Sequence, residues 1–275
     1  MKTFRGEPGI FREQPGGTKQ ADLDVTGLTL NFGGIMALSG VDLSVKSGEL
    51  LAVIGPNGAG KTSLLNCLTG FYRPQKGRIT FNGKDITHLP PHELVNRGIG
   101  RTFQNIELFP GMTVLSNMLL ARHVHSDYGL VRALLFSRAV REEEVRHRQI
   151  VEELIDFLEM QAIRKTPVGS LPYGLRKRVE LGRALALEPK LLVLDEPFAG
   201  MTLEEKEDMV RFLSELNGQW NQTMILVEHD MSIIMSISER IVALNFGEKL
   251  AEGSPETIQK NEDVIKAYLG DGSPL

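Results

Sequence analysis

The sequence lacks most of the features that mark secreted, membrane-spanning or nucleic-acid-binding proteins. Its 275 residues include one cysteine, Cys67, so no internal disulfide can form and a reducing compartment is favoured. No run of about 20 apolar residues occurs, so we expect no membrane-spanning helix, and residues 1–17 lack the apolar stretch of a signal peptide. The net charge is only −4, which argues against a broad basic surface for nucleic acid.

What the chain does have is the composition of an ordinary globular protein. Apolar residues make up 41% and charged residues 24%, so a core of normal size can form in one large domain or two small ones. Residues 1–20 are rich in glycine, proline and charge, and they predict a flexible N-terminal extension. Cys67 falls in an apolar run, where a buried side chain is expected.

The pattern of apolar runs predicts an α/β fold. Two runs, at 190–197 and 223–230, are apolar and contain acids at their ends, which is typical of strands buried on both faces of a mainly parallel sheet. Residues 105–187 instead show helical spacing, and we interpret them as a helical block inserted into one sheet-based core. Further strands are expected at 28–32, 41–45 and 49–54, with hairpins around Asn82-Gly83 and within 240–253.

The most informative stretch is "VIGPNGAGKTSLLN", residues 53–66, which follows a strand-like run. It fills the pattern G-x-x-x-x-G-K-[ST]: glycines let successive backbone N–H groups converge on a phosphate, and Lys61 adds a positive charge. Thr62 offers an oxygen to Mg²⁺. Because a strand precedes and a helix follows, we favour nucleotide binding over an incidental glycine-rich turn. The predicted binding residues are Gly55, Pro56, Asn57, Gly58, Ala59, Gly60, Lys61, Thr62 and Ser63.

Acidic residues follow the buried strand at 190–197. Asp195 and Glu196 lie where ligands gather in open α/β sheets, beyond the carboxyl end of a strand. We expect Asp195 to hold the hydration shell of Mg²⁺ and Glu196 to orient and deprotonate a water molecule. The alternative is an acidic cap for the next helix. His229 ends the second such strand, where it could donate to a terminal phosphate or serve a structural role.

With these segments in place, the chain resembles an ABC-transporter ATPase subunit over residues 23–270. The resemblance implies a P-loop NTPase (ABC ATPase) core with an inserted helical subdomain and an antiparallel β subdomain. It also implies that the cassette spans 21–257, with its helical subdomain at about 105–187 and a C-terminal tail at 258–275. ATP and Mg²⁺ are the expected cofactors.

The resemblance assigns roles to further residues. Gln104 in "RTFQN" matches the glutamine loop, which links the Mg²⁺ site to the transmembrane partner, and His229 matches the switch histidine. Thr62, Gln104 and Asp195 would then hold Mg²⁺, partly through water. Phe32 is similar to the aromatic residue that stacks on adenine, although an apolar side chain at a strand end is the alternative. Residues 199–202 occupy the D-loop position.

The signature motif departs from the family pattern L-S-G-G-Q. Residues 171–175 read L-P-Y-G-L, so Pro172 replaces the serine and Leu175 the glutamine. Gly174 and the start of a helix remain, so backbone donors could still face the γ-phosphate bound by a second cassette. That second cassette is expected to be an identical or a sister subunit, and the departure raises the question of how tightly the shared site closes.

Within the family, "FGGIMALSGVDLSV", "NCLTGFYRPQKGRI" and "GIGRTFQNIELFPGMTVLSNMLLA" resemble the ATPase of branched-chain amino-acid importers. This implies membrane permeases, indirectly a secreted binding protein, no nucleic acid, and a peripheral location on the cytoplasmic face of the cell membrane. Leu108 and Phe109 would lie in the segment that contacts the permease, or else in the chain's own core. The alternatives are a lipopolysaccharide exporter, which "DEPFAGM" also resembles, a urea or amide importer, and an ABC ATPase without a membrane partner, including a non-hydrolysing scaffold.

Overall fold

The structure of the protein is a computed structural model that describes residues 21–102, 104, 106–125 and 138–269. The extension expected at 1–20 therefore lies outside the described residues. The chain divides into two compact units. We call the described residues of 19–104, 190–199 and 206–275 the sheet unit, and those of 105–189 and 200–205 the helical unit.

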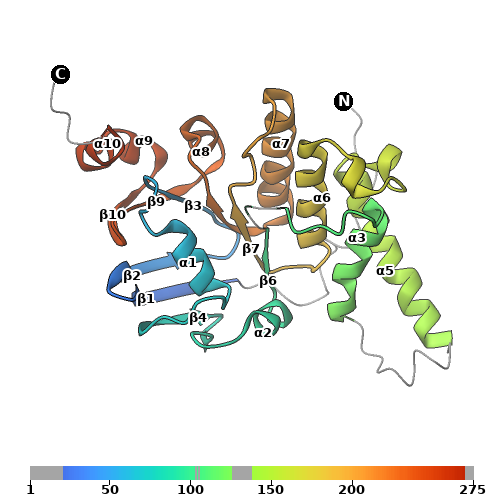
Figure 1. Ribbon diagram of the computed structural model, residues 1–275, viewed down its shortest axis with the longest axis horizontal. Coiled ribbons are helices and arrows are strands. Elements are labelled where there is room, and N and C mark those ends of the chain that lie inside the picture. Colours follow the sequence, from blue (N-terminus) through green and yellow to red (C-terminus); the bar gives the residue numbers. More distant parts are fainter. Residues whose placement is uncertain (1–20, 103, 105, 126–137, 270–275) are drawn as a thin grey trace. The chain divides into compact units, whose positions relative to one another are not determined.

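The sheet unit contains a six-stranded sheet among its described residues (Figure 1), with strand order β10-β9-β3-β8-β7-β6. The five strands from β9 to β6 run parallel, and β10 pairs antiparallel with β9. Every residue of β3, β7 and β8 is buried, so the continuously apolar runs of the sequence are the centre of a sheet covered on both faces. The strands are β3 (Leu50–Ile54), β6 (Ile99–Arg101), β7 (Leu191–Asp195), β8 (Thr223–Val227), β9 (Arg240–Asn245) and β10 (Glu248–Gly253).

A second, antiparallel sheet in the same unit has the order β2-β1-β4-β5 among the described residues. Its strands are β1 (Leu23–Phe32), β2 (Ile35–Val45), β4 (Lys76–Phe81) and β5 (Lys84–Asp85). Asn82 and Gly83 form the predicted hairpin turn, with φ of 51° and 72°, values that this residue pair tolerates better than most. The predicted strands at 28–32 and 41–45 are confirmed as the ends of the longer β1 and β2.

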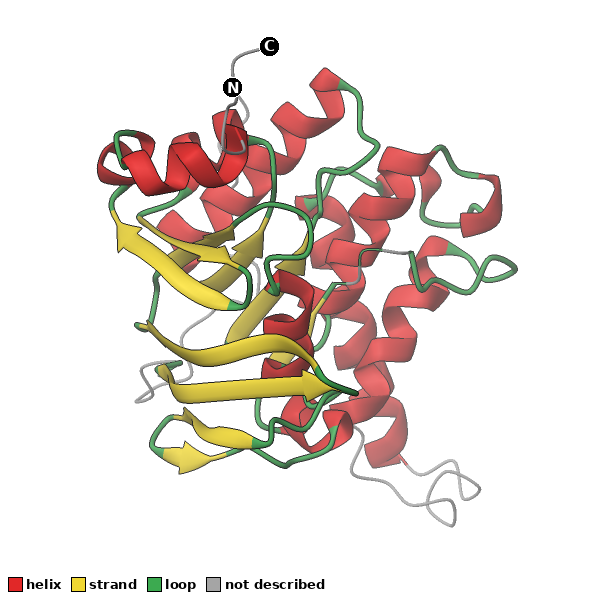
Figure 2. Ribbon diagram, turned by 60° about the vertical axis from the view of Figure 1, so that its left-hand side comes forward, coloured by secondary structure: helices red, strands yellow, loops and turns green. Residues whose placement is uncertain are grey.

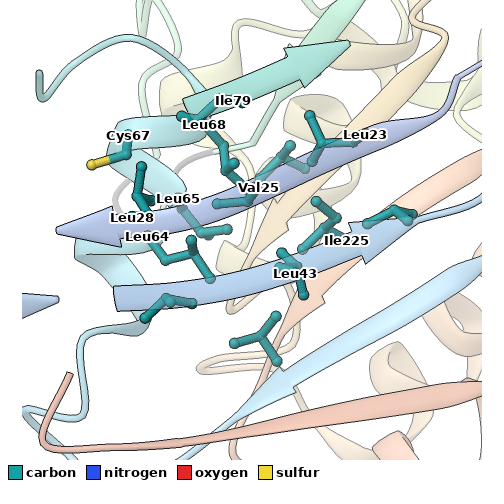
Figure 3. Packing of buried hydrophobic residues seen from close by; sticks show 14 of the residues in the cluster. Leu23, Val25, Leu28, Leu43, Leu64, Leu65, Cys67, Leu68, Ile79 and Ile225 are labelled. Atoms are coloured by element: carbon teal, nitrogen blue, oxygen red, sulfur yellow. The ribbon is translucent and has the colours of Figure 1, made fainter. Parts of the chain in front are cut away.

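Helix α1 (Lys61–Leu68) packs its leucines into the core of the sheet unit. Figure 3 shows this cluster, whose labelled side chains come from α1, β1, β2, β4 and β8. Leu64 and Leu65 are fully buried, which stabilises the fold by roughly 1.5–3 kcal/mol for each side chain. Cys67 is buried as expected, and burial raises the pKa of its thiol to about 12.

A smaller cluster lies on the opposite face of β3. Ala52 and Ile54 alternate with Leu51 and Val53 along this strand, so one pair faces each cluster. The smaller cluster fixes helices α8 (Met231–Ile237), α9 (Pro255–Gln259) and α10 (Glu262–Leu269) to the sheet. The sheet unit also contains α2 (Pro91–Asn96) and most of α7 (Leu203–Trp220).

The helical unit is built from α3 (Val114–Ala121), α5 (Arg138–Phe157) and α6 (Tyr173–Leu185), which Figure 2 colours red. Three short 3₁₀ turns complete it, η2 (Arg122–His125), η3 (Gln161–Ile163) and η4 (Val168–Ser170). Val151, Leu154 and Ile155 are fully buried, as their helical spacing predicts. Among the described residues, no helix of either unit combines the length and apolar character needed to cross a bilayer.

Two details differ from the sequence expectations. The helical pattern was expected from residue 105, but the first helix begins at Val114, because Pro110 and Gly111 interrupt it and Thr113 caps it by accepting a hydrogen bond from Ser116 N–H. The short elements β6 and α2 were not predicted at all. At three and six residues, they are too short to show a period in the sequence.

Candidate active site

The phosphate loop connects β3 to α1, and its glycines are required by its geometry. Gly55, Gly58 and Gly60 all have positive φ, and a Cβ on Gly60 would lie 2.6 Å from the carbonyl oxygen of Ala37. Gly60 is the N-cap residue of α1, and no side chain caps this helix. The N–H groups of the first turn are therefore available to an anion, and the helix dipole favours negative charge there.

Lys61 places a cation against this loop. Its ammonium group donates hydrogen bonds to the carbonyl oxygens of Gly55 at 2.6 Å and Pro56 at 3.0 Å. Burial lowers the pKa of Lys61, whereas the charges of Glu196 and Asp195 raise it. The predicted carboxylates thus lie close enough to the lysine to act on its charge. The next residue, Thr62, is exposed at the start of α1.

Asp195 ends β7 and is almost fully buried. Its Oδ2 atom accepts a hydrogen bond from Arg101 Nη2 at 2.8 Å, and Oδ1 is buried without a hydrogen-bond partner among the residues that the structure describes. Arg101 also donates from Nη1 to Asn66 Oδ1 at 2.7 Å and to Thr69 Oγ1 at 2.8 Å. Arg101 therefore holds Asp195 in one orientation and leaves its other oxygen unpaired.

The unpaired oxygen fits a hard divalent cation or one of its water ligands. Mg²⁺ takes oxygen ligands, usually keeps several waters, and is often bound by one or two carboxylates together with substrate phosphates. The described residues contain no cluster of three or more His, Cys, Asp or Glu side chains that could hold a metal on its own. The carboxylate of Asp195, the hydroxyl of Thr62 and the amide oxygen of Gln104 would accordingly supply only some of the ligands of Mg²⁺, with water and phosphate supplying the rest.

Gln104 and Glu196 meet at the same edge of the sheet. Gln104 Nε2 donates to Glu196 Oε2 at 3.1 Å, and the Glu196 N–H donates to the Val227 carbonyl at 2.9 Å. Glu196 has a φ of 47°, a strained value for a residue with a side chain. Its backbone hydrogen bond to the end of β8 helps to maintain this conformation.

His229 lies two residues beyond β8, and its ring is 63% exposed. Its Nδ1 atom is 3.6 Å from Glu228 Oε2, so the recorded contact of the ring is with Glu228 rather than with Glu196. Glu228 is buried and accepts hydrogen bonds from the N–H groups of Phe198 and His229, both at 3.0 Å. It thereby joins the segment after Glu196 to the turn that carries the histidine.

Phe32, at the end of β1, keeps an exposed aromatic face. The side chain is 45% exposed, and the Tyr72 ring meets it edge-on with centroids 5.0 Å apart. An edge-on partner supports one side of the ring and leaves a face for a planar base.

Gly174, the predicted residue of the signature motif, belongs to the helical unit. It is the second residue of α6, whose N-cap residue, Pro172, provides no side-chain cap. A Cβ at Gly174 would lie 2.2 Å from the carboxylate of Glu205, in the same unit, so no larger residue fits without displacing that group.

Sequence reasoning missed Arg101 and Glu228. Arg101 is the last residue of β6, three residues before Gln104, and Glu228 directly follows β8 and precedes His229. A charged residue at the end of a buried strand was the available signal, and it was applied only to the pair at 195 and 196.

Comparisons with known proteins place this geometry in a family. A model described as "ABC transporter" matches residues 38–199, and one described as "Branched-chain amino acid ATP-binding cassette transporter" matches residues 248–273. The chain is 42% identical over 249 residues to the high-affinity branched-chain amino acid transport ATP-binding protein BraF of Pseudomonas aeruginosa, covering 90% of this chain and 98% of the relative. It is 41% identical over 255 residues to LivG of Escherichia coli, with the same coverage.

Solved structures agree. An ATP-binding cassette of an ABC transporter in its ADP conformation matches with a TM-score of 0.79 at 32% identity, covering 91% of this chain and 99% of that chain. A dimeric bacterial ABC transporter cassette matches with a TM-score of 0.71 at 26% identity, covering 85% and 98%.

Proposed function

The chain belongs to the ABC transporter family of ATP-binding cassettes, and from this premise we propose that it is the ATP-hydrolysing subunit of an importer for branched-chain amino acids. The observation that carries the proposal is the near-complete coverage of the branched-chain relatives at about 40% identity, together with the family-specific match at residues 248–273. These relatives favour the importer over a lipopolysaccharide exporter, an amide importer or an ABC ATPase without a membrane partner. Residues 21–257 would form the cassette, with a helical subdomain at about 105–187 and a tail at 258–275.

In this proposal the phosphate loop binds ATP. Lys61 would exchange its carbonyl partners for β- and γ-phosphate oxygens, and the loop amides would donate to the same groups. The binding residues would be Phe32, Gly55, Pro56, Asn57, Gly58, Ala59, Gly60, Lys61, Thr62 and Ser63. Phe32 would stack on the base. Thr62, Gln104 and Asp195 would hold Mg²⁺, partly through water, and the ion would neutralise charge on the phosphates.

Glu196 would be the general base. A water oxygen attacks the γ-phosphorus, the bond to the bridging oxygen of ADP breaks, and the water's proton passes to Glu196; ADP and inorganic phosphate leave. The hydrogen bond from Gln104 would hold the carboxylate in place for this step. A positioned base contributes roughly 10²- to 10⁴-fold in rate. His229 would donate to the γ-phosphate, which requires its exposed ring to turn away from Glu228.

The site would be completed by a second cassette, either identical or a sister subunit. Gly174 would present the backbone N–H groups of the α6 N-terminus to the γ-phosphate of the facing cassette. Pro172 adds neither hydroxyl nor N–H, so this contact would depend on the backbone alone.

We propose that membrane permeases are the mechanical partner and that a secreted binding protein acts through them, with no role for nucleic acid. Phe109 is 50% exposed and could line a groove that receives a permease helix, whereas Leu108 is half-buried. The subunit would then lie peripherally on the cytoplasmic face of the cell membrane.

The test is reconstitution with the permeases and the binding protein in vesicles. We expect leucine uptake that requires ATP, and loss of uptake in Glu196→Gln, which retains ATP binding by calorimetry. The folded wild-type chain failing to bind ATP with Mg²⁺ present would overturn the ATPase assignment. ATP turnover with uptake of an amide but not of leucine, isoleucine or valine would overturn the cargo.

A further inference from the structure

The C-terminal helix reaches the first residue of the phosphate loop. The backbone N–H of Gly55 donates a 2.7 Å hydrogen bond to the hydroxyl of Tyr268, which lies 213 residues further along the chain on α10. Both residues belong to the sheet unit. Nothing in the proposed roles above uses this contact.

Gly55 is where the loop leaves the sheet. β3 ends at Ile54, and a Cβ on Gly55 would lie 2.3 Å from the Leu244 carbonyl oxygen and 2.9 Å from the Ala59 side chain. The residue is therefore enclosed by β9 on one side and by the loop itself on the other. Among the described residues, its N–H has its hydrogen-bond partner on α10.

The same residue is fixed at its carbonyl end by Lys61, at 2.6 Å. When Lys61 turns to a phosphate, that bond is lost, whereas the bond to Tyr268 does not involve the lysine. The phenol hydroxyl is thus the contact that can hold the start of the loop while the lysine moves.

Helix α10 is itself anchored. Val264 is 4% exposed and packs in the smaller core cluster beside Ile258 and Ile54. Burial raises the pKa of the Tyr268 phenol, so at physiological pH the Gly55 N–H is bonded to a neutral hydroxyl. Tyr268 itself remains 39% exposed.

We propose that Tyr268 is a positioning residue for nucleotide binding. Its hydroxyl holds Gly55, the first residue of the phosphate loop, and so connects helix α10 to the ATP site. The inference rests on the proposed ATPase function. It gives the C-terminal segment a role in nucleotide affinity rather than in the chemical step.

The experiment compares Tyr268→Phe with the wild type and with Ile265→Ala, an exposed position on the same helix. The first readout is hydrogen–deuterium exchange of the peptide that contains Gly55, without nucleotide. The second is the split between KM for ATP and kcat. We expect faster exchange at Gly55 and a KM about 3- to 10-fold higher, as the loss of one hydrogen bond implies, with kcat within twofold. Ile265→Ala should match the wild type in both.

Unchanged exchange and unchanged KM in Tyr268→Phe would overturn the inference while leaving the ATPase function intact. Faster exchange with an unchanged KM would also overturn it, because the hydroxyl would then serve local stability alone. A wild-type chain that binds no ATP would instead remove the proposed function. If Tyr268→Phe lowers the melting temperature by more than a few degrees, Tyr268→His provides the second variant. Because its ring keeps a hydrogen-bond acceptor, we expect a smaller rise in KM than in Tyr268→Phe.

Discussion

The phosphate loop and the signature segment both present the N-terminus of a helix, but the chain prepares them differently. At α1, Gly60 opens the first turn, the cation of Lys61 lies against the loop, and the charges of Asp195 and Glu196 act on it. At α6, Pro172 adds no donor, and a carboxylate, that of Glu205, lies beside Gly174. The cation at α1 lies against the phosphate loop, whereas the cation at α6, Arg176, donates to the Leu171 carbonyl at 2.8 Å and a carboxylate lies beside the helix start.

This difference assigns separate duties to the two regions. A loop with a cation and free amides can bind a phosphate chain without help, whereas a helix start beside a carboxylate adds less affinity on its own. We therefore expect changes in the sheet unit to act on nucleotide binding, and changes at the signature segment to act on turnover.

The largest effect should come from Lys61→Ala. Removing the buried cation deprives the terminal phosphates of a charge-assisted hydrogen bond, and we expect Mg-ATP affinity to fall by about 100-fold in calorimetry. The control is Lys76→Ala, an exposed lysine of the same unit. An affinity within threefold of the wild type would mean that the loop amides alone supply the binding and would break the comparison.

Arg101→Met should have the next largest effect. Without the guanidinium, the Asp195 carboxylate is free to rotate, and we expect the Mg²⁺ concentration for half-maximal turnover to rise by about tenfold or more, while metal-free ATP binding changes by less than threefold. Arg101→Lys should rescue this only in part, because a point charge cannot bond Asp195, Asn66 and Thr69 together.

Arg78→Met is the matched control, since Arg78 forms an exposed pair with Asp85. Because removing one partner of a buried pair also destabilises the fold, thermal unfolding is measured alongside. An equal loss of metal-free ATP binding in Arg101→Met and Arg101→Lys would show that the arginine supports the fold and not the orientation of Asp195.

The sequence predicted one of these regions better than the other. The phosphate loop could be predicted because its glycines, lysine and threonine are consecutive, so that local chemistry alone defines the site. The sheet centre was equally predictable, since β7 and β8 consist mainly of apolar residues and are buried throughout. Tertiary pairs were not: Arg101 with Asp195 and Gly55 with Tyr268 are 94 and 213 residues apart.

The orientation of His229 was beyond sequence reasoning for a related reason. Its position after β8 follows from the apolar run, but its contact with Glu228 depends on a carboxylate that also binds Phe198 N–H. The start of the helical segment at Val114, in α3, instead of at about 105 was a local error: Pro110 and Gly111 were visible in the sequence and outweigh the apolar spacing.

Gly174→Ala tests the signature side. The added methyl group would lie against the Glu205 carboxylate and push either it or the start of α6 aside, so we expect about a tenfold loss of ATP turnover with ATP affinity within twofold. Gly218→Ala is the control, because Gly218 lies in α7 with open space around it and alanine is the better helix residue. If Gly174→Ala lowers ATP affinity as much as it lowers ATP turnover, the signature segment contributes to nucleotide binding as well, and the contrast with the phosphate loop is wrong.

The smallest expected effect concerns the turn after His229. It tests whether charged groups also stabilise this part of the sheet unit. Asp230 caps α8 through Ser232 N–H and pairs with Lys206 at 2.8 Å. The hydrogen bonds from Lys206 and Ser232 lower its pKa from 3.8 to about 2. A carboxyl group with a lowered folded pKa contributes stability that is present above its ordinary pKa and is lost as the pH falls towards 2.

Asp230→Asn keeps a good capping residue but loses the charge, so it separates the ion pair from the cap. We expect it to lower the melting temperature slightly at pH 7, corresponding to less than about 1 kcal/mol because the pair lies near the surface, and the difference from the wild type should shrink between pH 4 and pH 2. Asp24→Asn, at an exposed aspartate of β1, is the control. A difference in melting temperature that persists unchanged to pH 2 would mean that the shape of the Asp230 side chain, and not its charge, stabilises this turn. The electrostatic contribution to the sheet unit's site would then be limited to Asp195 and Glu196.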